Sequence, residues 1–227
     1  MFVSEAISKI NYALRGVDDD APLVGDDDYN QWLSVLNSKK DDYANDVKQR
    51  WAATFDIKSV ATVVAAGTQT YDLPADFIAP SDEVYVVDTN GQRHSFTLIK
   101  PQQRQRNGSG QVFISGVNPK KLNFSADITA DNPLIGGTIQ APGYYRPADM
   151  TLPTNELPFD DPNWAVMAAA AEIAFNDVVY ETKAADLTEK ANELYNNMAK
   201  ANRVLTYGNA RTVPYNNRQQ ITSPGQG

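Results

Sequence analysis

The 227-residue sequence has no cysteine and only one histidine, His94. The absence of cysteine excludes disulfide bonds, thiolate zinc sites and cysteine nucleophiles. With one histidine, a multi-histidine metal site is impossible, and a histidine-based triad would depend on His94 alone. Long apolar runs are also missing, because the most hydrophobic stretch, residues 166–175, contains Glu172 and is too short to span a bilayer. These absences exclude several enzyme classes and predict no transmembrane segment.

Basic side chains are fewer than acidic ones, 20 against 28, and the net charge is −8. Residues 1–57 and 151–205 carry −5 each, residues 58–150 are neutral, and residues 206–227 carry +2. An acidic body disfavours binding to duplex DNA, which requires a basic surface. The first residues place Glu5 within their apolar part and have no basic leader, unlike a signal peptide. We expect a soluble protein made in a cytoplasm.

Helical patterns occupy both ends of the chain. Residues 4–15 have apolar side chains on one face and end at Gly16. Acidic residues 26–28 are typical of a helix start, and a long helix is predicted from there to about residue 54. Its expected buried stripe consists of Trp32, Leu36, Tyr43, Val47 and Trp51.

Two further helices are predicted after the middle of the chain. Asp160 and Asp161 precede Pro162, a typical first turn. The expected inner face of this helix consists of Trp164, Met167, Ala171, Ala174, Phe175 and Val178. The last helix is predicted over about residues 184–205, where apolar residues recur at spacings of four and three.

The middle of the chain has the pattern of β-strands. Extended segments are predicted at 59–65, 70–73, 83–88, 92–99, 111–115, 121–125 and 138–146. Asn90-Gly91 between two of these segments is a strong hairpin signal.

We therefore expect an α+β fold, in which a four-helix bundle with two N-terminal and two C-terminal helices carries a small inserted antiparallel β domain. The predicted domains are 1–57 with 151–205 for the bundle, 58–150 for the β domain, and 206–227 for an extended C-terminal arm. The arm is too polar to offset its own ordering entropy by packing on itself. It is either disordered or folds onto a partner.

No catalytic, cofactor-binding or metal site is predicted. The acidic runs at 18–20 and 26–28 lack the glycine and glutamate of an EF-hand loop. No G-x-S-x-G motif accompanies His94, which is expected on the surface of an edge strand. Two basic segments remain as candidate binding sites: the loop residues Lys100, Arg104 and Arg106, and the arm.

Two segments resemble bacteriophage head-to-tail adaptor proteins, the tail tubular protein A-like connectors of short-tailed phages. The segment TQTYDLPADFIAPSDEVYVVDTNGQ (68–92) resembles their T-x-Y-x-L-P-x-D-F motif and the hairpin that follows it. The segment GYYRPADMTLPTNELPFDDPNWAVMAAAAEIA (143–174) is similar to their Y-Y-R-x-P, L-P and alanine-rich helix region. The order of these features matches over nearly the whole chain.

The resemblance implies a virion structural protein rather than an enzyme, located in the neck between head and tail. It implies a ring, typically of twelve copies, that joins the portal protein to the tail nozzle or tail tube and lets genomic DNA pass without sequence-specific binding. It also implies that the arm docks on the portal and that the β domain faces the tail. The arm residues expected to contact the portal are Arg211, Val213, Tyr215, Arg218 and Ile221. Lys100, Arg104 and Arg106 could form a tail-facing loop.

Two alternative functions remain open on the sequence. One is a carbohydrate- or ligand-binding β module on a helical stalk, for which Tyr144 and Tyr145 are the only adjacent aromatic pair, although we expect these rings to pack on the bundle. The other is a single-strand nucleic-acid binder that uses Arg104, Arg106 and Phe113. The acidic body makes it the weakest hypothesis.

Overall fold

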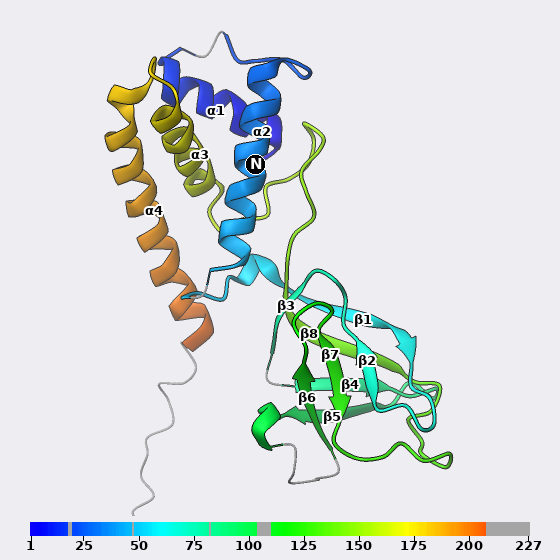
Figure 1. Cartoon of the computed structure of the whole chain (residues 1–227). Helices are drawn as coiled ribbons and strands as arrows, with labels where there is room; N and C mark the ends of the chain where they lie inside the picture. The colour runs from blue at the N-terminus through cyan, green and yellow to red at the C-terminus, as the bar shows by residue number, and fades with distance from the viewer. Residues whose placement is uncertain (18–19, 47, 82, 104–109, 208–227) are drawn as a thin grey trace, which may run out of the picture.

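The computed structural model describes residues 1–17, 20–46, 48–81, 83–103 and 110–207 (Figure 1). Four α-helices lie within these ranges: α1 (Val3–Arg15), α2 (Asp27–Ala44), α3 (Pro162–Asn176) and α4 (Glu181–Tyr207). They form one part of the molecule, called the helical part below. The strands form a second part, the sheet part, which lies beyond the lower end of α2 in Figure 1.

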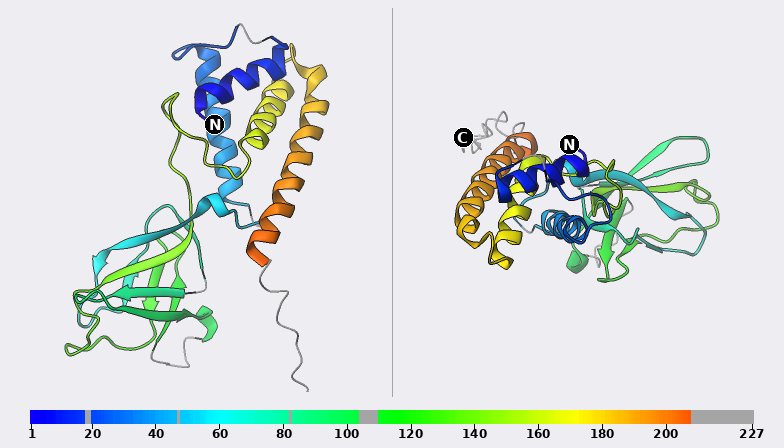
Figure 2. Two further views of the ribbon diagram at one scale, coloured as in Figure 1. Left: turned by 180° about the vertical axis from the view of Figure 1, so that it is seen from behind. Right: turned by 90° about the horizontal axis from the view of Figure 1, so that it is seen from above.

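Helix α3 is the centre of the helical part. It is apolar on nearly all sides, and it packs against α1, α2 and α4 (Figure 2). Its many alanines let these neighbours approach closely. The helix begins as the sequence predicts, because the Asp161 side chain accepts a hydrogen bond from the Asn163 backbone N–H and Pro162 occupies the first turn.

The predicted inner face of α3 is wrong at its C-terminal end. The helix ends at Asn176, and both Phe175 and Val178 are strongly exposed instead of facing the core. Trp164, Ala171 and Ala174 are buried as expected.

Helix α2 is shorter than predicted. It ends at Ala44, ten residues before the expected position, and the chain continues through a short 3₁₀ turn, η1 (Ala52–Thr54). Asn45 and Asp46 follow the helix, and such residues favour turns because their side chains compete for backbone hydrogen bonds. Trp51 nevertheless packs in the core, where its ring stacks on Tyr43 with a centroid distance of 4.9 Å. Val47 lies outside the described residues.

Eight strands form a single sheet in the described part of the chain. They are β1 (Phe55–Val63), β2 (Thr70–Asp72), β3 (Phe77–Pro80), β4 (Glu83–Val87), β5 (Arg93–Leu98), β6 (Gln111–Ser115), β7 (Lys121–Phe124) and β8 (Thr138–Tyr145). The predicted hairpins are confirmed, since β4 pairs with β5 and β6 pairs with β7, both antiparallel. Gly91 makes the first turn with φ of 82°, a conformation that glycine adopts without strain.

The predicted fold class is wrong in its description of the β region. The strand order is β1-β8-β4-β5-β6-β7-β2, and β5 and β6 run parallel, so the sheet is mixed. It is also large and curls until β2 packs beside β1, like a half-closed barrel (Figure 1). The short local pattern around residues 97–112 predicts two strands but not their parallel pairing, because that pairing spans a long connection.

Strand β8 pairs with three other strands. It pairs with β1 on one side, and β3 and β4 lie end to end along its other side. Gly143 permits this arrangement, because a Cβ at that position would lie 2.6 Å from the Ala79 carbonyl oxygen. Strand β3 was not predicted, since its four residues give no alternating pattern.

The two parts bury separate apolar clusters, and no residue belongs to both. The helical cluster contains residues from all four helices together with Trp51, Leu157 and Phe159. The sheet cluster contains residues from 60 to 145, including Val86, Leu122, Ile139 and Tyr145. The two parts are therefore joined by connecting segments and polar contacts rather than by a common core.

Candidate interaction surfaces

The residues predicted to bind partners lie mostly outside the described part of the chain. This applies to the arm residues Arg211, Val213, Tyr215, Arg218 and Ile221 and to the loop residues Arg104 and Arg106. Lys100 is described, and it lies between β5 and a short 3₁₀ turn, η2 (Pro101–Gln103). The arm and loop assignments therefore stay predictions.

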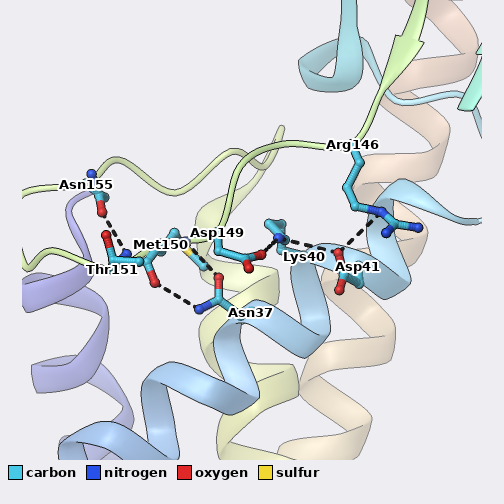
Figure 3. Close-up of polar contacts among 8 residues, drawn as sticks. All are labelled: Asn37, Lys40, Asp41, Arg146, Asp149, Met150, Thr151 and Asn155. Carbon is cyan, nitrogen blue, oxygen red and sulfur yellow. Dashed lines mark hydrogen bonds and ion pairs between the residues drawn. The ribbon is translucent and has the colours of Figure 1, made fainter. Parts of the chain in front are cut away.

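A buried lysine marks the junction between the helical and sheet parts. Lys40 lies on α2 and is completely buried, and its Nζ donates a hydrogen bond to the Asp149 carboxylate, with Asp41 Oδ1 3.4 Å away (Figure 3). Asp149 follows β8 in the chain. The Lys40 hydrogen bond lowers the pKa of Asp149, because it stabilises the charged carboxylate. This contact therefore fixes the exit of β8 against the side of α2.

The same junction is held by a pair of matched amide contacts. Asn37 Nδ2 donates to the Met150 carbonyl and Asn37 Oδ1 accepts from the Met150 backbone N–H, each at 2.9 Å (Figure 3). Arg146 Nε lies 3.7 Å from Asp41 Oδ1. Asn37, Lys40 and Asp41 are all on α2, so one helix face positions the whole segment after β8.

This junction was not predicted from the sequence. The sequence signal for it is a gap in the apolar stripe of α2, because Lys40 stands where the spacing of Trp32, Leu36 and Tyr43 requires an apolar side chain. Lysine at such a position is usually solvent-exposed at the edge of a helix face. Only the three-dimensional structure reveals the carboxylate from residue 149 that satisfies it.

The second connecting segment, between α2 and β1, is tied to α4. Tyr195 Oη donates to Asp46 Oδ2 at 2.6 Å, and Asn202 Nδ2 donates to the Arg50 carbonyl at 2.9 Å. Burial and the neighbouring Asp46 charge raise the pKa of Tyr195 to about 12. The phenol therefore stays a hydrogen-bond donor at neutral pH.

Three cations meet on the sheet side of the junction. Burial lowers the pKa of Lys120, and the nearby positive charges of Arg50 and Arg146 lower it further. Lys120 Nζ donates to the Phe77 carbonyl at 3.1 Å, which keeps it on the sheet.

Large apolar side chains are exposed at the end of the helical part that lies away from the sheet. This surface, the apolar tip, comprises two turns at the top of Figure 1: the turn before α2 and the turn between α3 and α4. Its four large apolar side chains are between 66% and 87% exposed. They are Leu23, Val24, Val178 and Val179.

Polar contacts hold the two turns of the apolar tip in place. Arg15, at the end of α1, donates from Nε to Tyr180 Oη at 3.0 Å and pairs through Nη2 with Asp28 Oδ2 at 2.9 Å. Lys183 Nζ donates to the Leu14 carbonyl at 2.8 Å. The end of α1 thus bridges the turn before α2 and the start of α4.

The apolar tip also carries an acidic hollow of about 600 Å³. Four aspartates line it together with Arg15, Ala21, Pro22 and Leu23. The aspartates are Asp20, Asp26, Asp27 and Asp28. Their charges exceed the single charge of Arg15, so the hollow is suited to a basic group.

A groove of about 480 Å³ runs over α3 between α2 and α4. Its apolar surface combines the rings of Trp164, Phe175 and Tyr195 with the small side chains of Ala168, Ala171 and Ala191. Lys39 pairs with Glu172 across it. Helices α2 and α4 therefore leave part of α3 uncovered.

The residues considered for catalytic or ligand-binding chemistry lie in structural contacts. Among the described residues, no group of three or more His, Cys, Asp or Glu side chains could hold a metal ion. His94 Nε2 lies 3.0 Å from Asp88 Oδ2 in a hairpin, and this hydrogen bond lowers the pKa of Asp88. Tyr145 packs in the sheet cluster, not on the helices as predicted, and its hydroxyl donates to the Ala141 carbonyl. The tyrosine pair is therefore not an exposed ligand platform.

None of the helices within the described ranges is long and apolar enough to cross a membrane.

A family comparison covers both parts of the molecule. The model of the family described as SU10 adaptor protein matches residues 4–218. The chain belongs to the SU10 adaptor protein family. No curated protein matches the sequence.

Membership in the SU10 adaptor family confirms the resemblance to phage head-to-tail adaptors. The family is one of structural phage adaptor proteins, not a known class of enzyme, and it implies a location in the neck of the virion. Surfaces that contact other proteins are therefore the functional sites to seek in this chain.

Proposed function

We propose that the protein forms a ring between the portal and the tail nozzle or tail tube, and that DNA passes through the channel of this ring. The observation that carries the proposal is the extent of the family match. Residues 4–218 include the helical part, the sheet part and most of the arm. The extent of this match supports a shared role of the three regions in one adaptor.

The charge of the chain suits a channel wall. With a net charge of −8, the chain repels phosphates instead of holding them, so DNA slides past it. Ring closure requires heterologous contacts, in which one face of a subunit meets a different face of the next. We propose twelve copies by the resemblance to portal-bound adaptors, with assembly in the host cytoplasm.

We further propose three functional units: residues 1–57 with 151–205, residues 58–150, and the arm 206–227. The two separate apolar clusters support the first boundary. In this arrangement the sheet part, with the loop residues Lys100, Arg104 and Arg106, faces the tail. The arm contacts the portal through Arg211, Val213, Tyr215, Arg218 and Ile221.

The first test is the light-scattering mass after size exclusion, for the protein alone and mixed with the portal ring from the same genome. We expect a monomer that becomes a fixed multiple of copies on the portal. Stable rings of the isolated protein would contradict templated assembly but not the adaptor function. A protein that does not associate with the portal would contradict the adaptor function itself.

A second test concerns the arm. Deletion of residues 206–227 should leave the helical and sheet parts folded, because the apolar clusters described for both parts are built from residues 3–199, and should abolish attachment to the portal. The double variant Tyr215→Ala/Arg218→Ala should weaken attachment, whereas Gln219→Ala, a polar neighbour, should not. A truncated protein that binds as tightly as the full chain would refute the arm assignment.

A further inference from the structure

We propose that the apolar tip is a second portal contact, separate from the arm, and that it docks on a portal surface with an apolar recess edged by lysine or arginine side chains. This inference rests on the proposed function, in which the sheet part faces the tail. The tip lies at the end of the helical part opposite the sheet (Figures 1 and 2).

The exposure of the tip is the first argument. Val178 and Val179 are consecutive, and they place two large apolar side chains in one short turn. Leu23 and Val24 do the same in the neighbouring turn. Isolated exposed apolar residues are ordinary on protein surfaces, but groups of them mark contact sites. Burial of these side chains by a partner would remove the largest apolar exposure in this end of the molecule.

The rigidity of the tip is the second argument. Arg15 donates hydrogen bonds to Tyr180, next to the α3–α4 turn, and to Asp28 and the Asp20 carbonyl, next to the turn before α2. One side chain therefore connects both turns. The guanidinium is charged at any working pH, so its contacts with Tyr180 and Asp28 are charge-assisted. A surface held in its binding shape loses less entropy when it docks.

The negative charge of the tip indicates which partner surface would bind it. The hollow beside Leu23 is lined by Asp20, Asp26, Asp27 and Asp28, and Asp177 begins the turn before α4. Two identical tips would bring these acidic groups together, so a second copy of the same surface is a poor partner. A basic side chain of the portal would enter the hollow while Val178 and Val179 enter an apolar recess.

The test is portal binding by the full-length chain with the double substitution Val178→Lys/Val179→Lys. Both side chains are exposed, so folding should be unchanged, as circular dichroism and thermal unfolding would verify. We expect portal affinity to fall at least about tenfold, because two central apolar contacts are lost and two positive charges face a basic rim. Val117→Lys is the matched control: Val117 is equally exposed, at 88%, but lies in the β6–β7 turn, and binding should change by less than about twofold.

A second variant tests the acidic hollow. Asp27→Asn should weaken portal binding at low salt and have a smaller effect as salt rises from about 50 to about 500 mM, because salt screens exposed charge pairs. The tip assignment is overturned if Val178→Lys/Val179→Lys binds like the original chain, or if Val117→Lys is equally impaired. It is also overturned if the tip variant changes the mass of the protein without portal. Failure of the unmodified chain to bind portal would instead refute the proposed function.

Discussion

The two parts of the molecule expose apolar side chains for different reasons. In the sheet part, Phe55, Ile57 and Val63 alternate along β1 and point away from the core, as every second residue of a strand must. In the helical part, Tyr12 is placed outward in the same way by the periodicity of α1, whereas Leu23, Val24, Val178 and Val179 lie in turns. Exposure on β1 thus follows from the geometry of a strand, whereas exposure at the tip follows from no repeating backbone pattern. Pairs of exposed residues in two turns, unlike the single Val117 of the β6–β7 turn, are what supports the proposed portal contact.

The helical and sheet parts also differ in the composition of their apolar clusters, which matters for stability. The helical cluster is built from aromatic rings and alanines around α3, and the sheet cluster is built mainly from aliphatic side chains on facing strands. Because they share no residue, we expect a core substitution to affect one part far more than the other.

The largest effect is expected for Trp51→Ala. Trp51 is almost completely buried between Tyr43 and Tyr195, and its removal should destabilise the helical part by about 3–5 kcal/mol through lost burial and a cavity. Leu122→Ala is the counterpart in the sheet and should cost about 2–5 kcal/mol there. Amide hydrogen exchange, resolved by segment, would measure both. Equal loss of protection in both parts from either variant would show that they unfold as one unit.

A smaller energetic effect but a clear structural one is expected for Lys40→Met. Methionine keeps the apolar stem in the core while removing the charge, so stability should change by less than about 1 kcal/mol. Loss of the Asp149 contact should, however, loosen the sheet relative to α2.

The chain has no native cysteine, so spin labels can be placed at Val117→Cys and Val178→Cys, one in each part. Pulsed electron paramagnetic resonance should show a broader distance distribution for Lys40→Met than for the parent pair. Lys9→Met, at an exposed position on α1, is the control. An unchanged distribution would mean that the remaining junction contacts are sufficient.

The smallest effect is expected from pH. The His94 and backbone hydrogen bonds hold the pKa of Asp88 below its ordinary value in the folded protein. The carboxylate therefore stabilises the sheet at neutral pH, and this stabilisation is lost as pH falls below about 4 and through the folded pKa. Asp88→Asn should make sheet stability less sensitive to acid, as thermal unfolding between neutral and acidic pH would reveal. Identical acid sensitivity in the variant would exclude Asp88 as a contributor.

Local signals in the sequence predicted local structure well. The Asn90-Gly91 turn and the Asp161-Pro162 helix start act within a few residues, and both are found as predicted. The β5–β6 pairing and the position of β3 along β8 depend on contacts between distant segments, which no local pattern specifies.

The errors at Phe175 and Val178 have a different cause. Helical periodicity assigns apolar residues to an inner face on the assumption that the helix continues. Because α3 ends at Asn176, Val178 falls in the following turn, and Phe175, in the last helical turn, lines the groove over α3 instead of the core. Val178 thereby became a candidate for the contact site, while the arm residues stay predictions from sequence.

The pairing of Phe55 with Tyr144 has a mechanical consequence. The chain enters the sheet through β1 and leaves it through the neighbouring strand β8, so two adjacent covalent tethers connect the sheet to the helices. A single tether would act as a swivel, whereas two tethers side by side resist torsion and share any pulling force. A twist applied to the sheet is therefore transmitted to α2 and α4 together, instead of being absorbed at the connection.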